Sequence, residues 1–347
     1  MLRPSVALSC LVLAQAALAA EPVTLDNVVD PGANTPEEPL AESFSADNAV
    51  RFLDSASLNW QKQRECFTCH TNYAYLYARP LVSADTESHK SVRAFAEQLV
   101  SERWDDKGPR WDDEVVATAA ALAFNDAHST NTLHPLTRTA LDKMWSLQRE
   151  DGGWTWIDCD WPPMEDDDGY GVCLAALAVS VAPDDYRETE AAQRGLAGIR
   201  NYLAANPPPT LHHRMMLLWA DSYGADVLTD EQAQQCVTEL RDLQHADGGW
   251  GIAQLGDWPR ADDSPQDLET SNGYGTGFAV FVMRRAGVPA DDPAIEQGIA
   301  WLKSNQRASG RWFTRSLYKD SKHFITHAGT AFAVMALAEC EVPMRSE

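Results

Sequence analysis

The residues with the clearest chemical potential in this sequence are two cysteines and a histidine, in the stretch C-F-T-C-H at positions 66 to 70. In the pattern C-x-x-C-H, two thiols can add to the vinyl groups of a haem, and the adjacent histidine coordinates its iron. The motif therefore predicts a c-type haem bound by Cys66, Cys69 and His70. Such a haem would serve electron transfer to a redox partner, or a haem-dependent oxidoreductase reaction.

Two other chemistries use the same side chains. Cys66, Cys69, His70 and a fourth ligand such as His327 make up a Cys2His2 zinc set. Alternatively, the two cysteines form a disulfide in an oxidising compartment, and His70 only caps a helix. The haem hypothesis makes one structural demand that the others do not, because a haem needs a pocket beside the motif.

The beginning of the chain predicts export. Residues 1–20 carry one arginine, then an apolar run of signal-peptide length, then small residues suited to cleavage. This run is too short for a membrane anchor, and no later apolar run is long enough to span a bilayer. We therefore expect a secreted protein, in the periplasm or outside the cell, without a transmembrane segment after cleavage.

Two further features bound the function. Residues 21–44 are rich in Pro, Glu and Asp and lack periodicity, so they should form a disordered or extended N-terminal arm. The formal net charge of −23 argues against nucleic acid as a partner, because phosphates require a basic surface.

Apolar residues recur at helical spacing through most of residues 45–347, and no alternating strand pattern appears. Some of the predicted helices mix charged and apolar positions, whereas others are small-residue-rich and apolar nearly all round, which indicates outer and inner helices. Their alternation predicts an all-α domain, an α/α toroid of about six helical hairpins, with the inner-helix N-termini at one rim. The predicted helices are 45–64, 70–79, 86–104, 112–127, 134–149, 168–181, 187–205, 209–223, 229–245, 272–286, 292–306 and 323–341.

A short repeat supports the ring. L-Q-R-E-D-G-G-W at 147–154 matches L-Q-H-A-D-G-G-W at 243–250, and N-Q-R-A-S-G-R-W at 305–312 is a degraded copy. Asp-Gly-Gly suits a tight turn, and the tryptophan can stack between hairpins. The Q-x-x-D-G-G-W pattern resembles the repeat of the squalene-hopene cyclase and protein prenyltransferase β-subunit superfamily. This resemblance implies the fold more strongly than it implies the reaction.

The resemblance also implies two candidate sites. Squalene-hopene-type cyclases protonate an alkene with D-x-D-D at the head of an inner helix, and E-D-D-D-G at 165–169 makes Asp168 the candidate acid, with a helix cap as its competing role. The alternative function is thus an isoprenoid cyclase, or a carrier of an apolar isoprenoid or lipid. Protein prenyltransferases bind zinc with Asp, Cys and His. His327 matches that histidine, but the other two positions fall near 271–274, where neither residue occurs.

Ring closure predicts that the two ends of the domain meet. Gln63 aligns with the glutamine of each repeat, which places residues 66–69 on the turn of the first hairpin. His70 then opens the first inner helix and His327 opens the last, and these helices are neighbours in a closed ring. We expect the two histidines to lie close together, with His327 as second iron ligand or acid–base group. A structural or interaction module with a Cys66–Cys69 disulfide is the third hypothesis.

Overall fold

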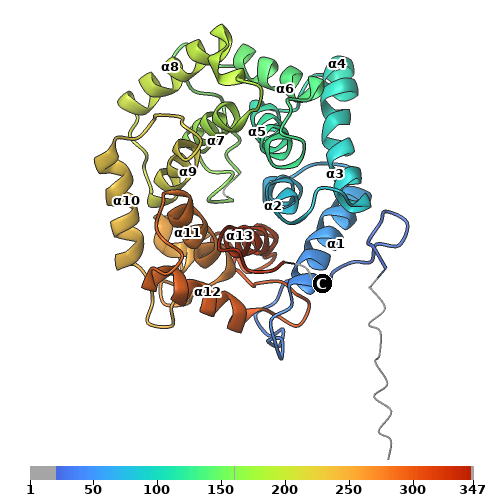
Figure 1. Ribbon diagram of the computed structural model, residues 1–347, viewed down its shortest axis with the longest axis vertical. Helices are drawn as coiled ribbons and strands as arrows, with labels where there is room; N and C mark the ends of the chain where they lie inside the picture. The colour runs from blue at the N-terminus through green and yellow to red at the C-terminus, as the bar shows by residue number, and fades with distance from the viewer. Residues whose placement is uncertain (1–20, 160, 345–347) are drawn as a thin grey trace, which may run out of the picture.

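Helices supply nearly all the regular structure of the computed structural model, which describes residues 21–159 and 161–344. They form two concentric rings of paired helices (Figure 1). The outer helices are α1 (Ala46–Arg64), α3 (Glu87–Gln98) with α4 (Trp104–Lys107), α6 (Pro135–Ser146), α8 (Glu190–Ala205), α10 (Asp230–Asp242) and α12 (Pro293–Asn305). The inner helices are α2 (Ala74–Val82), α5 (Asp112–Ser129), α7 (Asp168–Val181), α9 (Leu211–Asp221), α11 (Gly273–Arg285) and α13 (Ile325–Glu339). The predicted α/α toroid of about six hairpins is confirmed.

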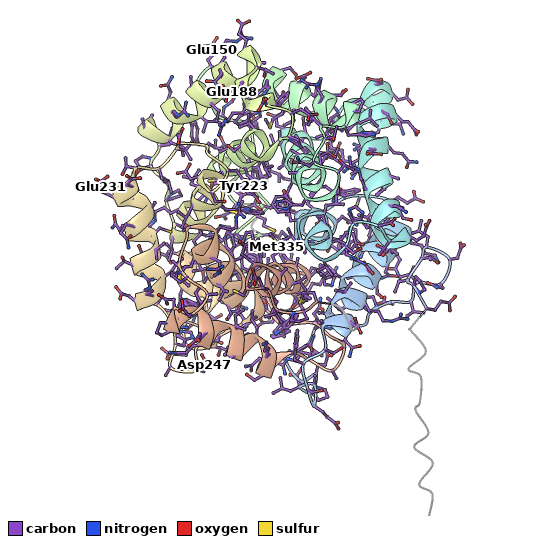
Figure 2. The ribbon with its side chains drawn as sticks, viewed as in Figure 1. Glu150, Glu188, Tyr223, Glu231, Asp247 and Met335 are labelled. Carbon is purple, nitrogen blue, oxygen red and sulfur yellow. The ribbon has the colours of Figure 1, made fainter. Side chains whose placement is uncertain are left out.

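The two rings differ in what their residues can bury. Glu188, just before outer helix α8, and Glu231, in α10, lie at the periphery, whereas Met335 of inner helix α13 lies inside (Figure 2). Small residues let the inner helices approach each other closely. A Cβ atom on Gly277 of α11 would lie 2.4 Å from the backbone nitrogen of Ala333 in α13. Any larger residue at position 277 would therefore push these two helices apart.

The repeat tryptophans tie each turn to the outer helix before it. All three are fully buried, and each indole Nε1–H donates to a backbone carbonyl ten residues earlier. The pairs are Trp154 with Met144, Trp250 with Leu240, and Trp312 with Leu302. Because the same bond recurs in all three copies, the repeat is a folding device rather than a catalytic motif.

The repeat glutamines connect each turn to the next outer helix. Gln148 Nε2 donates to the Gly152 carbonyl of its own turn at 2.9 Å and to the Gly195 carbonyl of α8 at 3.0 Å. Gln306 Nε2 donates in the same way to the carbonyl of Ser45, and the Ser45 backbone N–H donates to Gln306 Oε1 at 2.8 Å. Ser45 caps α1. The last repeat therefore closes the ring onto the first helix.

Residues 21–44, the expected arm, contain no helix and lie against the last repeat. Arg311 anchors this arm: its guanidinium donates to backbone carbonyls of residues 31–33 and to Asn34 Oδ1, and pairs with Glu38. Arg311 occupies the position of the second glycine in D-G-G-W. The degraded repeat thus carries the residue that binds the arm. The expected signal peptide, residues 1–20, lies outside the described residues.

Aromatic side chains fill the centre of the inner ring. Tyr77 packs edge-to-face on Trp219 with ring centroids 5.3 Å apart, and Phe278 packs on Phe332 at 4.4 Å. The cavity left beside Cys69 is about 10 Å³, which barely accommodates one water molecule. A ligand of isoprenoid size therefore has no room at the ring centre in this arrangement. Within the described ranges, no helix has both the length and the apolar character needed to cross a membrane.

Candidate functional site

The C-F-T-C-H segment forms the turn between α1 and α2, at the position that the repeat alignment predicts. Cys69–Tyr73 adopt a π-helical turn that leads into α2, a conformation found frequently at functional sites. Cys66 and Cys69 are both free thiols. The disulfide of the third hypothesis is therefore not present in the structure, and this expectation is corrected.

Cys66 and His70 line the same pocket, which we call the rim pocket and which has a volume of about 360 Å³. Phe324, just before α13, stacks on the His70 ring with centroids 5.4 Å apart and planes at 13°, and Trp60 of α1 meets the ring edge-on at 5.0 Å. The motif therefore faces a cavity, as the haem hypothesis requires. The other lining residues are Arg64, Trp161, Pro162, Met164, Glu165, Ser316, Lys322 and Ile325.

Cys69 lines a different cavity from Cys66. Its side chain is 8% exposed and borders the small central cavity beside Tyr73 and Tyr77. Burial raises the pKa of the Cys69 thiol well above its usual value, so the thiol stays protonated at neutral pH. Met164 borders both cavities and lies on the loop that precedes α7. The two thiols thus border neighbouring spaces that share Met164.

His70 and His327 lie on either side of the Thr71 hydroxyl, as ring closure predicts. His70 Nδ1 is 2.8 Å from Thr71 Oγ1, which is 2.9 Å from His327 Nδ1, and the two ring centroids are 6.4 Å apart. His327 Nε2 is 3.1 Å from Asn34 Nδ2. Burial lowers the pKa of each histidine to about 3, so both rings are neutral at pH 7. Hydrogen bonds occupy both nitrogens of His327, which leaves neither open to an iron atom.

Asn34 and Phe324 are site residues that sequence analysis missed. Asn34 belongs to the arm, where no periodicity signals a contact, and its partner His327 lies at the other end of the domain. Phe324 lies within H-F-I-T-H, so its closeness to His327 was visible in the sequence, but its stacking on His70 was not. The rim pocket thus combines residues from the first hairpin, the last hairpin and the α6–α7 loop.

Asp168, the candidate acid, is held in an ion pair. Its Oδ2 accepts from Arg149 Nη1 at 2.6 Å and its Oδ1 accepts from the Trp156 backbone N–H at 2.9 Å. Its neighbour Asp167 caps α7, accepting from the Tyr170 backbone N–H. Both carboxylate oxygens of Asp168 are thus engaged in holding the loop between α6 and α7. The geometry therefore favours loop anchoring over alkene protonation at Asp168, which does not line the rim pocket.

A second carboxyl, also missed in the sequence, is better suited to retain a proton. Burial, with a smaller contribution from the nearby Glu165 carboxylate, raises the pKa of Asp113 to about 7. Asp113 Oδ1 is buried without a hydrogen-bond partner. The residue lies in W-D-D-E at the start of inner helix α5, so the acidic cluster at an inner-helix start was the available signal.

The zinc set is not assembled. In the part of the chain that the structure describes, no three His, Cys, Asp or Glu side chains converge in a way that could hold a metal ion. Cys69 borders the central cavity, and His327 is committed to Thr71 and Asn34. The residues present therefore do not fit a four-ligand zinc site.

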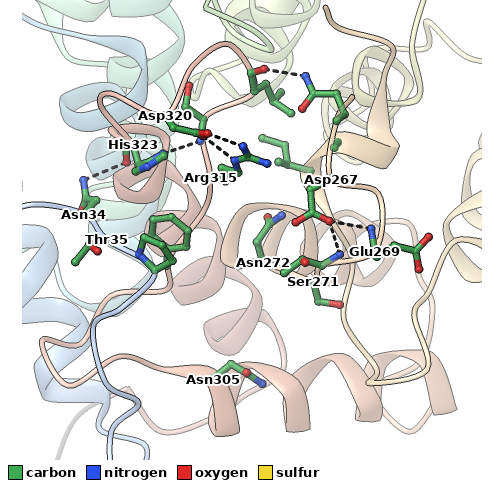
Figure 3. Close-up of a pocket in the computed structure, with 18 of the residues that line it drawn as sticks. Asn34, Thr35, Asp267, Glu269, Ser271, Asn272, Asn305, Arg315, Asp320 and His323 are labelled. Carbon is green, nitrogen blue, oxygen red and sulfur yellow. Dashed lines mark hydrogen bonds and ion pairs between the residues drawn. The ribbon is translucent and has the colours of Figure 1, made fainter. Parts of the chain in front are cut away.

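A larger polar pocket, of about 890 Å³, lies between the arm and the loops that precede α11 and α13 (Figure 3). Arg315 pairs with Asp320 through both carboxylate oxygens, and Asp267 accepts from the backbone N–H groups of the turn that follows it. Asn34 borders this pocket and donates through Nδ2 to the carbonyl of His323 at 3.1 Å. Residues 66–70, Asp168 and His327 do not line it.

Comparisons with known proteins agree with the fold. The sequence-family model of the squalene-hopene cyclase C-terminal domain matches residues 215–339, just over a third of the chain. No curated protein matches it. Among solved structures, ent-copalyl diphosphate synthase from Streptomyces platensis is similar at 15% identity and a TM-score of 0.50, over 78% of this chain and 50% of that one. A polysaccharide lyase aligns at 13% identity and a TM-score of 0.36, over 89% and 92%.

The family match and the similarity to the synthase concern architecture. At 15% identity, the similarity to the synthase shows a shared helical fold, and this chain spans about half of the synthase's length. The family match covers the last hairpins, which carry His327, and does not include the first hairpin, which carries Cys66 and His70. The rim pocket combines the two regions.

Proposed function

We propose that this protein binds an apolar ligand of isoprenoid type in the rim pocket. The observation that carries the proposal is the pocket itself, an aromatic-walled space of about 360 Å³ with a single imidazole in its wall. Pockets of this volume that are mostly apolar, with few polar groups, are typical of small-molecule sites. Trp60, Trp161 and Phe324 supply apolar surface, and His70 supplies a hydrogen-bonding ring nitrogen. The charged side chains of Arg64, Glu165 and Lys322 also border the pocket.

The location of the pocket distinguishes this proposal from cyclisation at the ring centre. The centre is packed with aromatic side chains, and Asp168 is ion-paired away from the rim pocket. The resemblance to terpenoid-handling proteins supports the class of ligand, although it specifies no reaction. We therefore propose a binding or carrier role, outside the cytoplasm, rather than catalysis by Asp168.

A second candidate, a c-type haem in the same pocket, is favoured by a specific observation. Cys66 and His70 of the C-x-x-C-H motif share the pocket, and Arg64 and Lys322 in its wall could pair with haem propionates. A haem held there by Cys66, Cys69 and His70 would supply one-electron chemistry to a redox partner. The fit is incomplete on one point: Cys69 borders the neighbouring cavity, so Met164 would have to move before both thiols reached one porphyrin edge.

One preparation tests both candidates. The full chain is expressed in a host that matures haem c, and the intact mass is measured after denaturation. A mass increment of one haem together with a visible Soret band would support the second candidate and overturn the first. A haem-free mass is the result that we expect.

The haem-free protein is then titrated with farnesene and farnesyl methyl ether by calorimetry. We expect binding with a negative heat-capacity change, which marks the burial of apolar surface. Ile325→Phe, which fills part of the pocket, should weaken binding at least about tenfold, a loss of about 1.4 kcal/mol. Leu268→Phe, at an exposed surface position, is the matched control. Equal affinities for both variants would place the ligand elsewhere.

A further inference from the structure

The hydrogen bonds that lead from the arm to His70 determine which ring nitrogen of His70 carries a proton. We infer that Asn34, acting through His327 and Thr71, sets His70 to present Nε2–H to the rim pocket, which thereby favours apolar ligands with an acceptor oxygen. Asn34 is a positioning residue in this scheme, since it does not line the rim pocket. The ligand preference rests on the proposed function, whereas the proton position can be measured without a ligand.

The first step is the orientation of the Asn34 amide. Its Oδ1 accepts from Arg311 Nη1, and its Nδ2 donates to the His323 carbonyl. A flipped amide would set N–H against the guanidinium N–H, and oxygen against the carbonyl oxygen. Because arginine has no acceptor and a carbonyl has no donor, both contacts would be repulsive. The Nδ2 group therefore also faces His327, as a donor (Figure 3 shows its bond to His323).

The second step passes this constraint to His327. Its Nε2 faces the Asn34 amide donor, so Nε2 must be the acceptor and carry no proton. A neutral imidazole has one N–H, which then resides on Nδ1. His327 Nδ1–H donates to Thr71 Oγ1 at 2.9 Å.

The third step fixes which of Thr71 and His70 donates the hydrogen bond between them. Its hydroxyl accepts from His327, and the remaining neighbour of Oγ1 is His70 Nδ1 at 2.8 Å. If His70 also donated, the buried hydroxyl proton would have no acceptor among the described residues, which is costly for a side chain that is 3% exposed. The hydroxyl therefore donates to His70 Nδ1, and the His70 proton resides on Nε2.

The consequence concerns what the pocket can bind. His70 lines the rim pocket, and no hydrogen bond engages its Nε2 within the described part of the chain. An Nε2–H there donates to an ether, carbonyl or hydroxyl oxygen of a ligand. The same atom cannot coordinate iron while it carries a proton. For His70 Nε2 to bind iron, each proton in the hydrogen-bond series from His70 through Thr71 to His327 would have to move to the opposite partner. His327 Nε2–H would then face the Asn34 amide N–H, which is unfavourable.

The test is the nitrogen-15 spectrum of the histidine side chains in the full-length, ligand-free protein at pH 7. The shifts of the two ring nitrogens distinguish a protonated from a bare nitrogen. We expect protonated Nε2 and bare Nδ1 for His70, and the opposite for His327. A proton on Nδ1 of His70, or on both nitrogens, overturns the inference with the wild-type protein alone.

Asn34→Asp supplies the matched variant. A carboxylate accepts instead of donating, so it should draw a proton to His327 Nε2 and move the His70 proton to Nδ1. His212, which bonds to Tyr274 in the core, is the internal control and should keep its pattern. An unchanged His70 pattern in a variant that retains the His212 signals overturns the role of Asn34.

Ligand preference is measured with the same two proteins. The wild type should bind farnesyl methyl ether about tenfold more tightly than farnesene, as one hydrogen bond allows, and Asn34→Asp should lose this preference. Equal affinities of the wild type for the two probes overturn the preference while the proposed ligand site remains. If neither probe binds, the proposed function fails, whereas the nitrogen spectrum still decides the proton position.

Discussion

Cys66 and Cys69 differ in their surroundings although they lie one turn apart. Cys66 borders the rim pocket, and Cys69 is buried beside aromatic side chains. Reactivity toward alkylating agents belongs to the thiolate, so a thiol whose pKa is raised by burial reacts slowly. The motif is therefore asymmetric, with one accessible and one protected thiol.

We predict that iodoacetamide modifies Cys66 much faster than Cys69 in the native, haem-free protein at pH 8. Trypsin does not cleave the Arg79–Pro80 bond, so it releases both residues in the peptide 65–90, and tandem mass spectrometry of that peptide locates the label. In denaturant, both thiols should react at similar rates. Comparable native rates would show that Cys69 is accessible, and would revive a site that uses both thiols.

Residue chemistry alone located part of the site. The spacing C-x-x-C-H predicted one site for Cys66, Cys69 and His70; Cys66 and His70 line the rim pocket, whereas Cys69 borders the central cavity. Asn34 and Trp161 were not predicted as site residues because they belong to irregular segments. The partners of such residues depend on how the loops lie on the ring, and no periodic pattern in the sequence indicates that. Asp168 was chosen by resemblance to a motif, and its Arg149 partner lies in a repeat loop that was read as structural.

At the scale of elements, helical periodicity predicted well. All twelve predicted helices appear, with ends that differ by a few residues. They were predictable because inner and outer helices bury different faces, and each kind has its own apolar pattern. The closeness of His70 and His327 followed from one topological step, the closure of the ring. The π-helical turn at Cys69–Tyr73 had no such signal, because it lies at the start of the inner helix, where no earlier turn sets a phase that an extra residue would shift.

Inner helix α5 begins with a carboxyl that destabilises the fold when it ionises. Burial raises the pKa of Asp113 to about 7, against about 4 for an exposed aspartate. Between these values the folded state binds more protons than the unfolded state, so stability falls as the pH rises from 4 to 7. Below pH 4 both states are protonated and this cost disappears.

We predict that Asp113→Asn stabilises the protein increasingly as pH rises. The difference in unfolding free energy between variant and wild type should grow by about 2 kcal/mol from pH 5 to pH 8, because the amide cannot ionise. Urea denaturation at the two pH values measures it. A difference that does not change with pH would mean that the Asp113 carboxyl is ionised throughout.

At the scale of the whole molecule, the arm lies across the junction between the two ends of the ring and also contacts the site at His327. Gln306 and Ser45 close the ring through reciprocal hydrogen bonds, and Arg311 beside them holds the arm across that junction. Asn34 is part of the same arm and contacts His327. Arg311, which departs from the repeat pattern, therefore has a role in holding the arm. A glycine at position 311 would match the repeat but would release the arm.

We predict that Arg311→Gly frees the arm without opening the ring. Glu37 and Glu38 make the arm a substrate for a glutamate-specific protease, and Arg311 pairs with Glu38 in the native protein. The variant should be cut there at least about tenfold faster than the wild type, because loss of several charged hydrogen bonds raises the population of the undocked arm by more than that factor. Intact-mass measurement over a time course follows the cut.

The ring itself supplies the control. Arg315→Gly removes an arginine from the same loop whose partner is Asp320 rather than the arm, so its arm should stay protected. If Arg311→Gly exposed glutamates throughout the ring, the residue would be a general stabiliser of the fold. If it exposed none, other contacts would hold the arm. Cleavage confined to the arm would establish that Arg311, which replaces the repeat glycine, holds the segment that contacts His327.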